Sequence, residues 1–110
     1  MRDAVRDWNQ WLSSERRTAD HTTAAYGRDV RKFIHFLSEH LGGPAALSDL
    51  AKLKPVDFRS YLARRRSQGL SNNSLARSMS AIRSLFRFLE RTDRVHNPAI
   101  NAVRTPKRPH

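Results

Sequence analysis

Arginine is the residue type in this sequence whose number and spacing best define a chemistry. The 110 residues carry 21 basic and 10 acidic side chains, a formal net charge of +11, and 17 of the basic residues are arginines. The guanidinium group donates two parallel hydrogen bonds to a phosphate. Between Phe58 and Leu89 there is no acidic residue. This acid-free segment holds seven arginines: Arg59, Arg64, Arg65, Arg66, Arg77, Arg83 and Arg87.

A segment with one sign of charge repels itself, so a polyanionic partner explains it better than an ordinary solvated face. The same sequence offers little to catalysis. It has no cysteine, no glycine-rich phosphate loop and no paired histidines at metal-ligand spacing. Tyr26 and Tyr61 fall on apolar stripes, which favours core aromatics whose hydroxyls reach water. We therefore expect no catalytic centre, no metal and no cofactor in these residues.

Hydrophobic periodicity predicts an all-α fold, a compact four- to five-helix bundle. Apolar residues spaced three and four apart define each helix, and glycine or proline separates them. We expect Thr22 and Ser71 to act as N-caps for two of the helices. The four predicted helices cover residues 2–17, 23–41, 55–68 and 72–91, with shorter turns at 47–53 and 99–103. The predicted domain covers residues 1–104, and residues 105–110 are predicted to begin a linker to a further domain.

Two of these helices carry a polar face opposite their apolar stripe. On the helix after Ser71 this face holds amide, hydroxyl and guanidinium groups, the donors that contact bases and phosphates in a major groove. On the helix after Thr22 it holds small residues and cations. We expect substitution of Arg28 or Arg77 to leave the fold intact, because both lie opposite the core side. The predicted polar faces are Asn73, Arg77, Ser80, Ser84, Arg87 and Arg91 on one helix, and Ala24, Arg28, Arg31, Lys32 and His35 on the other.

In its order of motifs the chain resembles the N-terminal core-binding domain of the tyrosine recombinases, the phage-integrase family, and most closely its Xer type. The segments that carry the resemblance are Trp8–Leu12, Thr22–Leu37, Leu53–Ala63, Gly69–Leu89 and Asn97–Ala99, followed by Thr105–Pro109. The resemblance implies a SAM-like helical domain that forms half of a clamp around DNA, with its second and fourth main helices in the major groove. It places the catalytic residues in a C-terminal domain that is absent here, so this fragment is expected not to be an enzyme. Xer proteins act in pairs to resolve chromosome dimers.

Together, the polar faces and the resemblance predict one DNA-binding surface. Its predicted residues are Thr22, Ala25, Arg28, Arg31, Lys32, Asn73, Ser74, Arg77, Ser80, Ser84 and Arg87. The expected partners are duplex DNA, the C-terminal catalytic domain of the same protein and related recombinase protomers on DNA. We expect no membrane contact and a cytoplasmic location. Two alternatives remain: a generic helical DNA-binding or phage-integrase module, and a helical adaptor whose basic face meets an acidic protein.

Overall fold

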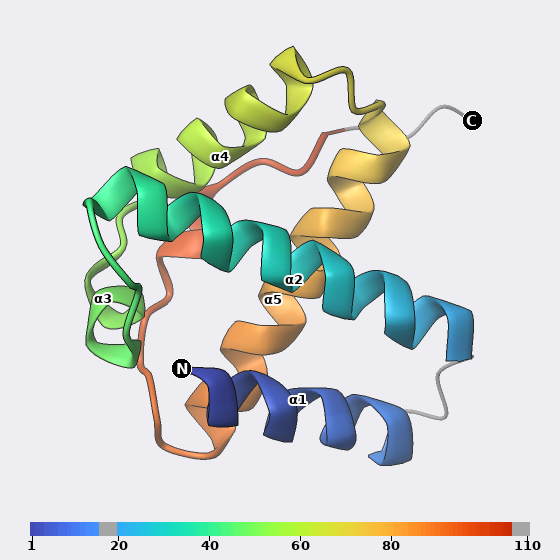
Figure 1. Ribbon diagram of the computed structural model, residues 1–110, viewed down its shortest axis with the longest axis vertical. Helices are drawn as coiled ribbons and strands as arrows, with labels where there is room; N and C mark the ends of the chain where they lie inside the picture. Colours follow the sequence, from blue (N-terminus) through green and yellow to red (C-terminus); the bar gives the residue numbers. More distant parts are fainter. Residues whose placement is uncertain (16–19, 107–110) are drawn as a thin grey trace.

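The structure, a computed structural model, describes residues 1–15 and 20–106, and in those two ranges it contains helices joined by loops and no strand. Figure 1 shows α2 lying across α5, with α1 below and α4 above. The predicted all-α fold is confirmed. The elements are α1 (Arg2–Glu15), α2 (Asp20–Leu41), α3 (Leu47–Lys52), α4 (Pro55–Ser67), α5 (Asn72–Arg91) and a 3₁₀ turn, η1 (Ala99–Ala102).

Helix α5 begins where its sequence predicts. The Ser71 hydroxyl accepts a hydrogen bond from the Ser74 backbone N–H at 3.2 Å, as an N-cap should. The predicted cap at Thr22 is wrong, because α2 begins at Asp20 and Thr22 lies inside its first turn. A cap contributes only about 1 kcal/mol, so the cap preference of one threonine is weak beside the tertiary packing that stabilises a helix.

An aromatic cluster joins α2, α4 and α5. The Phe33 ring of α2 stacks on Phe58 of α4 at a centroid distance of 5.7 Å and meets Tyr61 edge-on at 5.2 Å. Phe58 in turn meets Phe86 of α5 at 5.6 Å. Trp8 of α1 is fully buried against the same core. Because these rings come from four helices, the cluster fixes how the helices cross.

The chain after α5 returns across the bundle and is held by side-chain hydrogen bonds. The Asn97 amide donates to the carbonyl oxygens of Leu50 and Leu53, at 2.8 and 2.9 Å. The predicted turn at residues 99–103 is found as the 3₁₀ turn η1. Arg83 of α5 donates to the Val103 carbonyl at 2.9 Å and also to the Thr105 hydroxyl. Thr105 is therefore attached to α5, and a domain boundary at residue 104 stays a prediction; residues 107–110 of the predicted linker lie outside the described residues.

Truncation of the core should test this packing. Met79 is fully buried and Phe86 is nearly so, so we expect Met79→Ala and Phe86→Ala each to lower the free energy of unfolding by about 2–5 kcal/mol. Val56→Ala is the matched control, since Val56 is 58% exposed on α4, and its stability should change by less than about 0.5 kcal/mol. Denaturant unfolding followed by circular dichroism measures all three. Equal losses for Phe86→Ala and Val56→Ala would contradict the assignment of the core.

Candidate nucleic-acid interface

A partly buried ion pair joins α2 to α5 within the predicted DNA-binding surface. Arg77 donates to Asp29 through Nε at 2.9 Å and through Nη2 at 3.2 Å, a two-pronged contact between residues 48 positions apart. The Asp29 side chain is only 5% exposed, whereas that of Arg77 is 44% exposed. Hydrogen bonding to Asp29 raises the pKa of Arg77 above its usual value. Asp29 therefore holds the guanidinium of Arg77 in place, while part of the Arg77 side chain remains exposed to solvent.

The ion pair bears on the expectation that substitution of Arg77 leaves the fold intact, because Arg77 has an internal partner that its place opposite the apolar stripe did not indicate. Two of its five N–H donors are used inside the protein, which leaves three for an external acceptor. Loss of the arginine would leave a buried carboxylate without its partner, and such a loss is costly. Arg77 thus has a structural role in addition to any contact with DNA.

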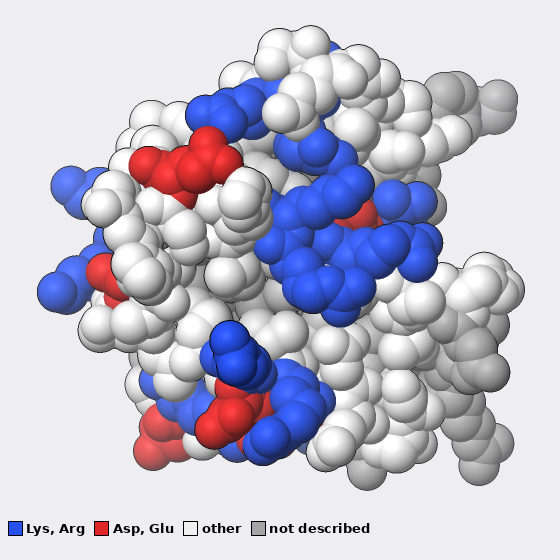
Figure 2. Space-filling view, in the orientation of Figure 1, with Lys and Arg blue, Asp and Glu red and all other residues white. Residues whose placement is uncertain are grey.

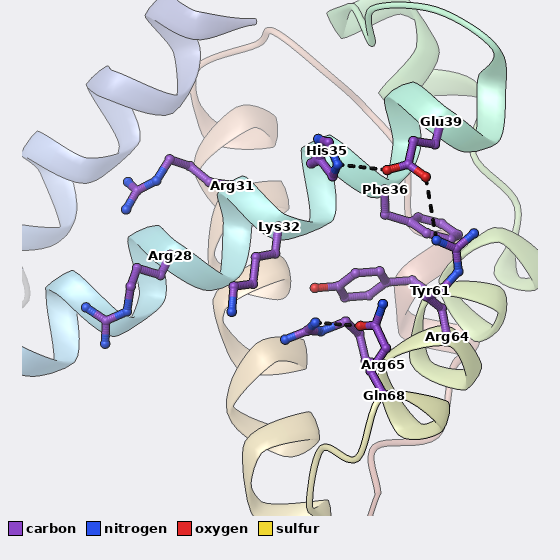
Figure 3. Close-up of a pocket in the computed structure, with 10 residues that line it drawn as sticks. All are labelled: Arg28, Arg31, Lys32, His35, Phe36, Glu39, Tyr61, Arg64, Arg65 and Gln68. Atoms are coloured by element: carbon purple, nitrogen blue, oxygen red, sulfur yellow. Dashed lines mark hydrogen bonds and ion pairs between the residues drawn. The ribbon is translucent and has the colours of Figure 1, made fainter.

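The cations of α2 lie beside this pair and are exposed. Arg28, Arg31 and Lys32 line a groove of about 410 Å³ between α2 and α4. Arg64, Arg65 and Tyr61 of α4 line the other side of the same groove (Figure 3). Figure 2 shows the resulting basic patch where α2 crosses the other helices. The predicted DNA-binding set does not include the α4 residues, although their spacing at i, i+3 and i+4 places them on one helical face.

Helix α1 covers the predicted surface farther along α5. The Trp8 indole N–H donates to the Ser84 hydroxyl at 3.1 Å, and both residues are fully buried. The placement of Ser84 on an exposed face is therefore wrong: it shares the helical face of Arg77, but α1 packs over that part of the helix. Arg87 is exposed on another side of α5, where it lines a groove with His96 and Pro98.

The remaining predicted positions lie near the Asp29–Arg77 pair but differ in exposure. Asn73 is exposed, and Ser74 and Ser80 are half-buried on α5. On α2, Thr22 is half-buried and Ala25 is buried, with 9% of its surface exposed. The structure thus joins α2 and α5 at the Asp29–Arg77 pair, buries Ser84 against α1 and places Arg87 in another groove. Contact of these residues with DNA stays a prediction.

Tyr61 also differs from its expected setting. Its ring packs between Phe33 and Phe36, at centroid distances of 5.2 Å in each case. The hydroxyl is buried and makes no hydrogen bond with any described residue, so the expectation that it reaches water is wrong. Burial raises the pKa of Tyr61 to about 12, against a smaller opposing effect of Arg65. The hydroxyl is therefore protonated at neutral pH and can act as a donor.

Comparison with known proteins agrees with this helical, basic domain. The family model of the phage integrase N-terminal SAM-like domain matches residues 5–93, and the chain belongs to this family. It is 43% identical over 109 residues to a protein named tyrosine recombinase XerC from Mesorhizobium japonicum, covering 99% of this chain and 35% of that relative. It is 44% identical over 102 residues to a protein of the same name from Agrobacterium fabrum, covering 93% of this chain and 32% of the relative.

The chain therefore spans about a third of the length of the curated relatives that it matches. No solved structure matches it significantly. In residues 1–15 and 20–106, no helix combines the length and apolar character that a membrane crossing requires.

The ion pair predicts an asymmetric response to mutation. Arg77→Ala leaves the enclosed Asp29 carboxylate unpaired, so we expect a loss of about 2–3 kcal/mol in the free energy of unfolding; the partial exposure of Arg77 keeps it below the largest losses seen for buried pairs. Asp29→Ala should cost less, because the freed Arg77 can extend into water. Arg28→Ala is the control for removal of one exposed arginine and should leave stability within about 0.5 kcal/mol. Equal stability of Arg77→Ala and Arg28→Ala would contradict the role given to the pair.

Proposed function

We propose that this domain binds duplex DNA as the N-terminal part of a site-specific tyrosine recombinase and holds the recombination site for a catalytic domain elsewhere in the same protein. The family of the chain and the printed names of its relatives support this proposal. The relatives are about three times as long as the chain, which leaves room for the cleavage and joining chemistry in the rest of such a protein.

The observation that carries the proposal is the cationic face built by α2 and α5. Arg28, Arg31 and Lys32 are exposed on α2, and the half-exposed Arg77 lies beside them. Asp29, the acid within this face, is buried and already paired. A DNA phosphate approaching the face thus meets cations with little opposing charge, and the amide and hydroxyl groups of Asn73 and Ser80 lie on the adjacent helix.

Helices α2 and α5 carry different groups and can make different kinds of contact with DNA. Contacts to phosphates fix the position of a protein on the duplex, whereas contacts to base edges specify the sequence. We propose that the cations of α2 supply phosphate contacts and that the start of α5 enters the major groove, which is wide enough for a helix. As part of a Xer-type recombinase, the domain would act with related protomers on one site during resolution of chromosome dimers in the bacterial cytoplasm.

The isolated domain should bind duplex DNA with a steep dependence on salt. Between six and ten phosphate contacts would lower the affinity by roughly 10³- to 10⁵-fold between 50 and 200 mM salt, because bound counterions are released on binding. Arg28→Gln with Lys32→Gln should reduce the slope of log affinity against log salt by about 2. Fluorescence anisotropy with a labelled duplex measures both.

The matched control is Lys52→Gln with Lys54→Gln, which removes the same charge from exposed positions on and next to α3. This control should keep most of the slope of the unchanged domain, because its charges lie away from the α2–α5 face. Equal effects of the two double variants would show that net charge, not the face, causes binding. Absence of binding at 50 mM salt would contradict DNA binding itself and favour an acidic protein partner.

A further inference from the structure

The groove between α2 and α4 contains two buried donors without a described acceptor. They are the Tyr61 hydroxyl and the Arg65 Nε–H. An unsatisfied buried polar group costs roughly 1–3 kcal/mol, so native proteins keep few of them. Both donors belong to the same face of α4 and line the same groove. Figure 3 shows the Tyr61 hydroxyl pointing along the groove, in the direction of Lys32 and away from Glu39.

The two ends of the groove differ in charge. At one end the Glu39 carboxylate lies 2.7 Å from His35 and 3.6 Å from Arg64, so negative charge is already present there. At the other end, Arg28 and Lys32 pair with no described carboxylate. Arg65 at this end donates to Gln68 at 2.7 Å, and that acceptor is neutral. The Asp29 carboxylate also acts on Tyr61, but it is already paired with Arg77. An anion is therefore attracted to the end that holds Arg28, Lys32 and Arg65.

The donors at this end match a phosphodiester group in number and type. A phosphodiester has two unbridged oxygens that share one negative charge, and each accepts hydrogen bonds. Tyr61 is 1% exposed and its ring is held by Phe33 and Phe36, so the position of its hydroxyl oxygen is already set before an anion arrives. The guanidinium of Arg65 and the flexible ammonium of Lys32 supply charge on opposite sides of the groove.

We propose that this end of the α2–α4 groove is a binding site for one phosphate of the DNA backbone, in which the Tyr61 hydroxyl and Arg65 donate hydrogen bonds and Arg28 and Lys32 supply further charge. The inference rests on the proposed DNA binding and adds a third helix, α4, to the interface. A contact to one backbone phosphate carries no sequence information. Its effect is to fix where α2 lies along the duplex.

Tyr61→Phe tests the site because it removes one oxygen and keeps the ring. A hydrogen bond to a charged group is worth roughly 1.5–3 kcal/mol, so the affinity for duplex DNA at fixed salt should fall about tenfold or more. Thermal stability should stay the same or rise, since the lost hydroxyl has no described partner. A lower melting temperature together with unchanged DNA affinity would overturn the proposal and give the hydroxyl a purely structural role.

Arg65→Gln is the second variant, and Arg59→Gln is its matched control. Both remove one charge from α4, but Arg59 points to η1, where it donates to the Ala102 carbonyl at 3.4 Å. Arg65→Gln should lower the salt slope by about 1, and Arg59→Gln should leave it unchanged. Equal slopes for the two variants would overturn the proposal.

Two further measurements identify the source of the phosphate. A duplex with single neutral methylphosphonates placed in turn along each strand should reveal one position whose neutralisation weakens the unchanged domain more than it weakens Tyr61→Phe, which keeps only the contribution of the cations there. Inorganic phosphate alone, at millimolar concentration, should stabilise the unchanged domain and Tyr61→Phe equally. If it stabilised only the unchanged domain while both proteins bound DNA with equal affinity, the site would bind a free anion, and the proposal that it binds a DNA phosphate would be overturned. If the unchanged domain fails to bind any duplex at 50 mM salt, the proposed function fails instead.

Discussion

The pair between Asp29 and Arg77 is the contact on which the proposed surface depends. It places a charged group of α5 against a buried carboxylate of α2, and so sets where these two helices cross. An arginine held at two points loses less conformational freedom on binding than a free one, because its geometry is already fixed. The same pair neutralises the charge of Asp29, the acid within the cationic face. A single interaction thus contributes both to the fold and to the electrostatic character of the surface.

The rest of the bundle decides how far this surface extends. Helix α1 packs over the later part of α5 and hides Ser84 through its hydrogen bond with Trp8, so the polar stripe of α5 is open only near its beginning. On the other side, the aromatic cluster of Phe33, Phe58 and Tyr61 brings α4 against α2 and creates a basic groove that neither helix has alone. The proposed surface is therefore the part of α2, α4 and α5 that the rest of the bundle leaves uncovered.

Periodicity was sufficient to predict the helices, the apolar stripe of α5 and its cap at Ser71, because these depend on residues close together in sequence. It could not predict the environment of Ser84, since a serine that is buried and hydrogen-bonded has the same place in the pattern as one that is exposed. The pairing of Asp29 with Arg77 joins positions 48 residues apart, so no local pattern contains it. The acid-free run from Phe58 to Leu89 includes Arg64 and Arg65 and indicated a polyanionic partner. That these arginines meet Arg28 and Lys32 in one groove depends on how α4 packs against α2, which the sequence pattern does not contain.

We propose that α2, α4 and the beginning of α5 form one continuous DNA-binding face. The most direct measurement is a titration of the ¹⁵N-labelled domain with a short duplex, followed by amide and arginine side-chain NMR signals at low salt. We expect the largest shifts on residues 25–32, 61–65 and 72–80, and we expect the arginine Nε–H signals of Arg65 and Arg77 to be among them. Shifts centred on the groove of Arg83, Arg87 and His96, with the α2 signals unchanged, would contradict it.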